Sequence, residues 1–291
     1  MELKSEIILT PPLQAATTVL LRDAPAGLEV FLVKRHGLSD VLGGAYVFPG
    51  GKLDASDAEL DTALHLDAAD QALHAALGEP DTAVSQAKGL FVAGLREAFE
   101  ESGVLFAQGG NKAMTEKAME LMQQGMKFNQ ILAELSLRLN TQVLVPWSRW
   151  ITPKIASVSS KRFDTRFFVA ALPPEQVASH DNHETTESVW LAPRTALEQY
   201  WRREIELAPP QIMSLAHLSR HSSVQTVLAE ARSKTPPLIC PEPVDVNGER
   251  VLCYPGDSRH SISMRGLPGP SCLIHRNRRF EPEQGFEALF I

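Results

Sequence analysis

The sequence predicts a mixed α+β fold with one large domain and an irregular carboxy-terminal extension. Apolar, β-branched segments of strand length alternate with segments of helix length that are rich in Ala, Leu, Glu and Gln up to about residue 235. The 291 residues are 44% hydrophobic and 22% charged, which allows a substantial core and excludes a disulfide-stapled miniprotein or a disordered chain. Eight of the 20 prolines fall within 236–291, so this extension is expected to consist of loops and short strands.

The expected elements follow from local composition and periodicity. Strands should be apolar and β-branched, whereas helices should carry apolar residues at steps of three and four. Glycine and proline mark the turns, as in Pro49-Gly50-Gly51 and at Gly103, and Gly125 should divide the third helix. The predicted order is strands 15–21, 28–34 and 45–48; helices 57–78, 82–102 and 112–139; strands 167–172 and 188–191; and helices 194–203 and 209–232.

Charge and cysteine content narrow the function classes. A net charge of -7 gives no general attraction to nucleic acid or to an anionic membrane. The three cysteines lie far apart, so we expect reduced thiols rather than disulfides or a structural zinc site. The acidic start of the chain is unlike a signal peptide, and no apolar run approaches the ~18–20 residues of a membrane helix. We therefore expect a cytoplasmic protein without nucleic-acid or membrane partners, and a homodimer is left open.

The most informative segment is Arg96-Glu97-Ala98-Phe99-Glu100-Glu101-Ser102-Gly103-Val104. On a helix, Glu97, Glu100 and Glu101 share one face, and Arg96 lies four residues before Glu100, where it can orient that carboxylate. Three crowded carboxylates repel each other unless a cation lies among them, and a hard divalent ion is the natural occupant. A solvated acidic helix face is the alternative that composition alone would favour.

With Phe48-Pro49-Gly50-Gly51 upstream, this segment resembles the Nudix box of the Nudix hydrolases, G-x5-E-x7-R-E-U-x-E-E-x-G-U. Gly51 matches the opening glycine, Asp57 replaces the first glutamate, and 38 residues separate Asp57 from Arg96 where the pattern has seven. An interrupted box is a feature of the coenzyme A diphosphatase branch. The resemblance implies a Nudix-type α/β/α sandwich with a mixed β-sheet over 1–235, a helical insertion at about 58–90 and a further helical segment at about 112–140.

The insertion is expected to form a separate flap whose two ends lie close together, so that Gly51 and Glu101 can share one site. The extension at 236–291 is expected to lie outside the Nudix domain.

A second motif points to the same branch. Coenzyme A-cleaving Nudix proteins carry a pattern like L-L-T-x-R-[SA]-x3-R-x3-G-x3-F-P-G-G, which Arg35, Gly44 and 48–51 match, whereas His36 and Asp40 depart from it. The resemblance implies Mg²⁺-dependent hydrolysis, or hydrolysis with Mn²⁺, of the diphosphate of coenzyme A or acyl-CoA to 3',5'-ADP and (acyl-)phosphopantetheine. The alternatives are a hydrolase of ADP-ribose or another nucleoside diphosphate derivative, and a Nudix-fold nucleotide-binding module without activity.

The candidate site residues combine this resemblance with the chemistry of diphosphate hydrolysis. Metal ligands would be the carboxylates of the acidic face and the carbonyl of the opening glycine: Glu97, Glu100, Glu101 and Gly51. Catalytic candidates are Arg96 with Glu100 and Glu101, and the general base is either a box glutamate or a loop acid, Glu184 or Glu187.

Three arginines could bind substrate phosphates: Arg35, Arg162 and Arg166. Solubilising charge on an edge strand is the alternative for the latter two. His217 and His221 lie four residues apart on a predicted helix, but the sequence lacks the H-E-x-x-H motif there, so we expect surface or core-edge histidines rather than zinc ligands.

Overall fold

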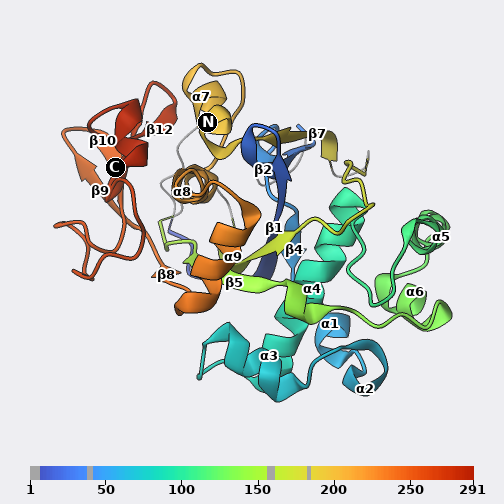
Figure 1. Ribbon diagram of the computed structural model, residues 1–291. Helices are drawn as coiled ribbons and strands as arrows, with labels where there is room; N and C mark the ends of the chain where they lie inside the picture. Colours follow the sequence, from blue (N-terminus) through green and yellow to red (C-terminus); the bar gives the residue numbers. More distant parts are fainter. Residues whose placement is uncertain (1–6, 38–41, 156–160, 182–184) are drawn as a thin grey trace.

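A computed structural model of the chain describes residues 7–37, 42–155, 161–181 and 185–291. Its centre is an eight-stranded mixed sheet of order β3-β2-β1-β6-β5-β8, in which β4 also pairs with β1 and β7 with β2 (Figure 1). The strands of this sheet are β1 Leu13–Ala24, β2 Gly27–Arg35, β3 Tyr46–Val47, β4 Gly50–Lys52, β5 Val145–Ile151, β6 Phe163–Ala171, β7 Thr185–Leu191 and β8 Leu238–Ile239. The helices are α1 Ala55–Glu59, α2 Thr62–His65, α3 Asp70–Leu77, α4 Val84–Ser102, α5 Lys112–Gln123, α6 Phe128–Glu134, α7 Pro193–Trp201, α8 Pro209–Leu218 and α9 Val224–Ser233, with 3-10 turns at Thr141–Val143 and Phe286–Phe290.

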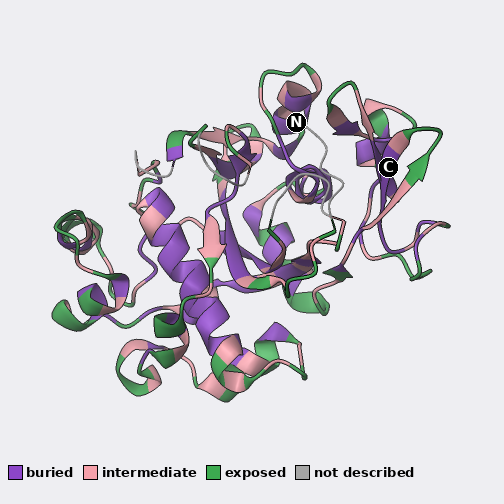
Figure 2. Cartoon of the chain, turned by 180° about the vertical axis from the view of Figure 1, so that it is seen from behind, coloured by how far each residue is buried: buried purple, intermediate pink, exposed green. Residues whose placement is uncertain are grey.

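Both faces of the sheet are covered by helices, which confirms the predicted sandwich. β1 and β2 form the expected antiparallel hairpin, and β1 runs parallel to β6. Successive side chains of a strand point to opposite faces. Accordingly Val19 and Leu21 pack with α7, α8 and α9, whereas Ala16 and Leu20 pack with α4. Figure 2 shows α4 and the central strands as the most continuously buried parts of the chain.

Three predicted helices are divided into shorter ones. The predicted helix 57–78 consists of α1, α2 and α3, because polar side chains bind nearby backbone and replace helical hydrogen bonds. Asp61 accepts from the backbone N–H of Leu64 at 3.2 Å and begins α2. The predicted helix 209–232 breaks where Ser223 caps α9, and α5 and α6 are divided near Gly125, whose φ is 87°. The division at Gly125 was predicted, whereas the other breaks were not.

Strand β5 was missed by the sequence analysis. It contains Pro146, which lacks an N–H, and its polar residues interrupt the apolar run. The pairing of β5 with β6 shifts register between Pro146 and Ser148, so a bulge accommodates the proline. Trp147 and Trp150 of this strand are nevertheless buried and belong to the core cluster beneath α8 and α9.

The insertion packs against α4 and does not form the expected separate flap. Leu60, Leu66, Leu73 and Leu77 share the core cluster of Phe91 on α4. The last residues assigned to the insertion, 84–90, are themselves the first turns of α4. Burial explains this difference, because α1 to α3 carry apolar side chains that would be exposed to water in a detached flap.

The extension after residue 235 begins in the main sheet and then builds a second one. β8 lies parallel to β5. A four-stranded antiparallel sheet follows, of order β12-β11-β10-β9, with bounds β9 Glu242–Val246, β10 Glu249–Cys253, β11 Cys272–Arg276 and β12 Arg279–Glu281. Tyr254 and Phe280 join the main core cluster, and the Tyr200 hydroxyl donates to the Phe280 carbonyl at 2.8 Å. The two sheets therefore share buried contacts.

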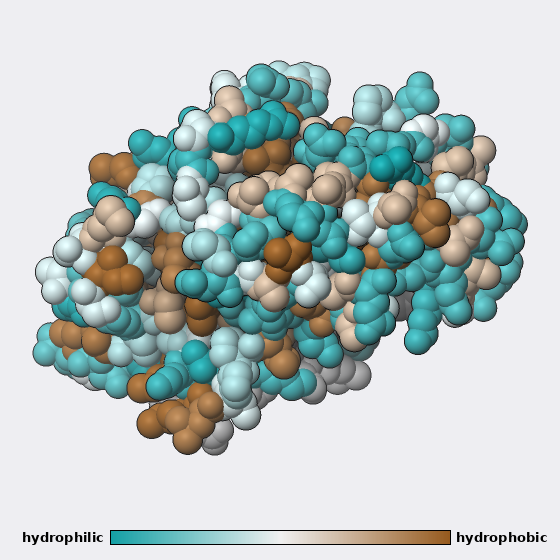
Figure 3. Space-filling view, turned by 90° about the horizontal axis from the view of Figure 1, so that it is seen from below, coloured by the Kyte–Doolittle hydropathy of each residue, from teal (hydrophilic) through white to brown (hydrophobic). Residues whose placement is uncertain are grey.

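Within the described ranges, the helices are all too short or too polar to span a bilayer. The face in Figure 3 shows hydrophobic side chains in separate patches among hydrophilic ones.

Candidate active site

Helix α4 carries the acidic face and is held tightly against the sheet. Gly94 permits this close approach: a Cβ there would lie 3.0 Å from Leu144 Cδ1 and 3.2 Å from Thr18 Oγ1. The Thr18 hydroxyl donates to the Gly94 carbonyl at 2.8 Å. The helix ends at Gly103, which has a left-handed φ of 71° as expected for a C-terminal glycine. The last two turns of α4 thereby lie beside β1 and β4.

The two halves of the interrupted box meet at Gly50 and Gly51. The Gly50 N–H donates to Glu101 Oε2 at 3.1 Å. A Cβ on Gly51 would lie 2.3 Å from Glu97 Oε1, and one on Gly50 would lie 2.5 Å from Thr17 Oγ1, so neither position has room for a side chain. The expected proximity of the opening glycines to the α4 glutamates is confirmed, although the insertion separates them in sequence.

Arg96 connects both halves through its guanidinium group. Its Nε and Nη2 each donate to a carboxylate oxygen of Asp57 at 2.9 Å, and the Asp57 side chain is fully buried. Nη1 donates to Glu97 at 2.7 Å and to Glu100 at 2.9 Å. Nη2 also donates to the carbonyl of Lys52. Burial alone would lower the pKa of Arg96, but the Asp57 hydrogen bonds and the surrounding carboxylates raise it above its usual value.

The three α4 glutamates differ in exposure. The Glu100 side chain is 35% exposed, whereas Glu97 and Glu101 are buried. Burial raises the pKa of Glu100, and the charge of Arg96 opposes that increase. Hard carboxylate oxygens beside a glycine turn that admits no side chain are chemically suited to a divalent cation such as Mg²⁺.

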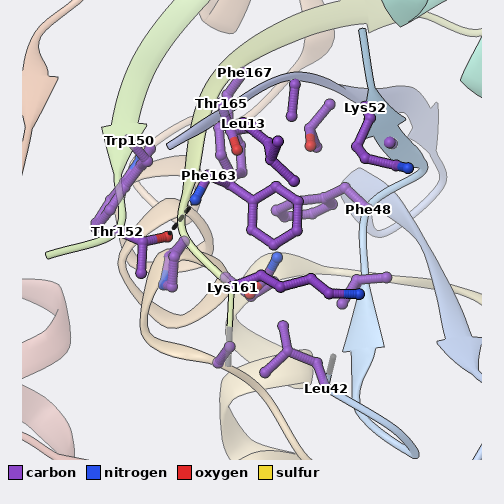
Figure 4. A pocket seen from close by; sticks show the side chains of 18 of the residues that line it. Leu13, Leu42, Phe48, Lys52, Trp150, Thr152, Lys161, Phe163, Thr165 and Phe167 are labelled. Atoms are coloured by element: carbon purple, nitrogen blue, oxygen red, sulfur yellow. Dashed lines mark hydrogen bonds between the residues drawn. The ribbon is translucent and has the colours of Figure 1, made fainter. Parts of the chain in front are cut away.

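A cavity of about 760 Å³ opens beside this cluster, and its lining combines charged and apolar side chains. The charged lining residues include Arg35, Lys52, Asp54, Arg96, Glu97 and Glu100. The apolar ones, here called the apolar wall, include Leu13, Phe48, Trp150, Phe163, Phe167 and Leu252. Phe167 packs edge-on against Phe48 and is tilted toward Trp150, with both ring centroids at 6.4 Å. Figure 4 shows these aromatic side chains gathered around the cavity, together with the long side chain of Lys161.

Of the three arginines predicted to bind phosphate, one lines the cavity and two do not. Arg35 lines the cavity, and its buried Nε has no hydrogen-bond partner among the described residues. Arg166 is 2% exposed and donates to Glu79 at 2.9 and 2.6 Å, outside the cavity lining. Arg162 donates to backbone carbonyls and is also absent from the lining. Protein acceptors thus bind both side chains, and their predicted contact with substrate stays a prediction without support from the cavity lining. Lys161 of the same segment does line the cavity.

Of the two loop acids proposed as the general base, the structure describes Glu187. Glu187 is exposed on β7, 3.3 Å from Lys34 Nζ, and is not part of the cavity lining. A hydrogen bond from Tyr46, with help from Lys34, lowers the pKa of Glu187, which makes it a weaker base. Its proposed catalytic role is at odds with this position. Glu184, like Asp40, lies outside the described residues.

Several lining residues were missed by sequence reasoning. Lys52 directly follows the Gly50-Gly51 turn, and this adjacency could have identified it. Trp150, Gln211 and Leu252 come from three distant segments, so no local pattern could have placed them in one cavity.

Comparisons with known proteins agree with this geometry. The profile of the NUDT19 Nudix domain matches residues 5–218. Acyl-coenzyme A diphosphatase NUDT19 from Xenopus laevis is 32% identical over 231 residues, which cover 67% of this chain and 61% of that protein. Putative nudix hydrolase 7 from Caenorhabditis elegans is 27% identical over 237 residues, 79% of this chain and 68% of that protein. The crystal structure of a NUDIX hydrolase from Alicyclobacillus acidocaldarius has a TM-score of 0.60 and 27% identity, covering 78% of this chain and 98% of that one. The match thus spans about three fifths of the length of the Xenopus relative.

Proposed function

The chain belongs to the NUDT19 Nudix domain family, and from this premise we propose that it hydrolyses the diphosphate of coenzyme A or an acyl-CoA. The observation that carries the proposal is that one cavity is lined both by charged side chains of the interrupted box and by an apolar wall. Coenzyme A combines the same two properties, because it has charged phosphates and a long pantetheine arm. The name of the Xenopus relative, an acyl-coenzyme A diphosphatase, supports the same choice.

We assign Glu97, Glu100, Glu101 and the Gly51 carbonyl as ligands of a divalent cation, Mg²⁺ or Mn²⁺. The oxygen donors suit a hard ion, and a side chain at position 51 would occupy the space of the Glu97 carboxylate. When bound, the cation would neutralise the diphosphate and polarise its P–O bonds. Arg96 orients Glu97 and Glu100 for this role and is itself fixed by Asp57.

The remaining roles are assigned to side chains that line the cavity. Hydrolysis adds the oxygen of water to one phosphorus and breaks the bridging P–O bond, giving 3',5'-ADP and (acyl-)phosphopantetheine. We assign Glu100 to take the proton of this water, because it is the most exposed box glutamate and burial raises its pKa. Arg35 would bind the 3'-phosphate, and the aromatic wall around Phe167 would contact the arm.

A substrate panel tests the reaction. The purified protein is incubated with coenzyme A, an acyl-CoA and ADP-ribose, with Mg²⁺ or Mn²⁺, and products are identified by mass spectrometry. We expect 3',5'-ADP from the coenzyme A substrates, and Glu101→Gln should lower turnover at least ~10²-fold, the scale for one strong transition-state contact. Faster cleavage of ADP-ribose would favour the alternative hydrolase. Nucleotide binding without cleavage of any substrate would favour the binding module.

Arg35 provides a sharper test of substrate class. Arg35→Ala should raise KM for coenzyme A by an amount corresponding to ~1.5–3 kcal/mol, the range for a hydrogen bond to a charged group, and affect dephospho-coenzyme A much less. Arg162→Ala is the matched control, because Arg162 lies outside the cavity lining and should change neither KM. Equal losses on both substrates would assign Arg35 to the diphosphate or to the fold.

A further inference from the structure

A second group of ligating side chains lies on α8, on α9 and in the segment between them, apart from the acidic face of α4. We propose that His217, His221 and Glu230 form a binding site for a divalent transition-metal ion of the zinc class. Among the residues the structure describes, these three form the group whose candidate ligand atoms all lie within 4.8 Å of one another. Two imidazoles and a carboxylate are a donor set that zinc commonly accepts.

The distances match ligands that share one ion. His217 Nε2 lies 2.8 Å from Glu230 Oε1, and His221 Nε2 lies 2.9 Å from Glu230 Oε2. Ligand atoms bound at ~2.0–2.2 Å around one tetrahedral ion lie about 3–3.5 Å apart. Each nitrogen is thus within a few tenths of an ångström of this spacing from a Glu230 oxygen, and the candidate ligand atoms of all three residues lie within 4.8 Å of one another.

The hydrogen bonds around His221 fix which of its nitrogens is available. The Thr226 hydroxyl donates to the Ser223 carbonyl at 2.8 Å, so toward His221 Nδ1, 3.2 Å away, it acts as acceptor. The Nδ1 atom of His221 therefore carries a proton, as in metal-binding histidines whose second nitrogen is hydrogen-bonded. The opposite atom, Nε2, is buried and has no hydrogen-bond partner within the part of the chain that the structure describes. A lone pair facing a carboxylate at 2.9 Å is unfavourable unless a cation or a second proton lies between them.

An aromatic ring covers one side of the group. The Trp147 ring packs on the His217 ring with centroids 4.4 Å apart, which shields the site from water.

Lys234 currently supplies a positive charge to Glu230 and would compete with the ion. Its ammonium group forms an ion pair with Glu230 Oε1 and lies 5.3 Å from the centre of the Trp147 ring. Lys234 is an exposed residue just beyond α9, so it can swing into solvent when an ion binds. Glu230 is 32% exposed at its side chain and gives the ion a route from solvent.

Zinc binding is measured by competition with a chromophoric chelator on metal-free protein, with excess Mg²⁺ present to occupy the proposed carboxylate site. We expect one tightly bound Zn²⁺ per chain, and Co²⁺ should give the visible absorption of a tetrahedral site. His221→Asn should weaken binding at least about tenfold, the lower scale for losing one metal-site interaction. Lys234→Met should tighten it, because the competing charge is removed.

Control variants separate this site from other metal ligands. His74→Asn, on α3, should leave Zn²⁺ affinity unchanged, and Glu230→Gln replaces His221→Asn if that variant does not fold. Absence of stoichiometric Zn²⁺ binding would overturn the proposal. So would binding that is lost with Glu97→Gln but unchanged by His221→Asn, because the ion would then occupy the carboxylate cluster. Neither result depends on whether the protein hydrolyses a diphosphate.

Discussion

Replacing Asp57 tests whether the buried pair with Arg96 holds the interrupted box together. Asp57 is fully buried, accepts two hydrogen bonds of 2.9 Å from Arg96 and accepts a third of 2.9 Å from the N–H of Asp54. Asp57→Ala removes all three and leaves the Nε of Arg96 without its carboxylate acceptor in a buried position. Removing one partner of a buried ion pair costs about 3–5 kcal/mol, so we expect the free energy of unfolding to fall by that amount.

Asp57→Asn should cost less, about 1–3 kcal/mol, because its amide oxygen can still accept one hydrogen bond. Urea unfolding curves measure both changes, with an unchanged m value as the check that only stability has changed. Glu59→Ala is the matched control, since this exposed acid lies on the same short helix and should alter stability by no more than ~0.5 kcal/mol. A loss below about 1 kcal/mol in Asp57→Ala would refute the reasoning, because Arg96 would then be held adequately by its other partners.

Two further predictions concern the glycine turn and a buried ion pair. Gly51→Ala places a Cβ 2.3 Å from Glu97 Oε1 and should lower metal-dependent turnover at least ~10²-fold, measured against Gly37→Ala, where a Cβ meets nothing within 4 Å. Burial alone would raise the pKa of Asp164, but hydrogen bonds of 2.8 and 2.7 Å from Arg149 help to lower it. A lowered pKa means that ionised Asp164 stabilises the folded state; this contribution is present above about pH 4 and is lost as the pH falls through the folded-state pKa. Arg149→Met should therefore destabilise the protein strongly at pH 7 and progressively less in acid. A pH-independent difference in urea midpoints between this variant and the unmodified protein would contradict the prediction.

Local patterns were sufficient for the hairpin, for α4 and for the glycine turn, because each depends on neighbouring residues. The sequence did not reveal β5, whose Pro146 is tolerated only through a bulge against β6. It also could not identify the partner of Arg96, since Asp57 lies 39 residues away and is brought close by the folding of the insertion.

Sequence reasoning also could not show that Lys161, and not Arg166, lines the cavity. Both belong to one cationic stretch, but Glu79 from the insertion binds Arg166 and leaves Lys161 at the cavity. Glu230 likewise joins His217 only through the packing of α9 on α8.

The carboxy-terminal extension has a consequence for how this enzyme family can diversify. The family profile ends at residue 218, yet Pro241 and Leu252 of the extension line the same cavity as the box residues. The carboxylates proposed to bind metal and part of the apolar wall are therefore encoded in separate stretches of the gene. Substitutions after residue 235 can reshape this cavity without changing the residues proposed for hydrolysis, so selectivity for the arm of the proposed substrate and the proposed cleavage chemistry are free to evolve at different rates.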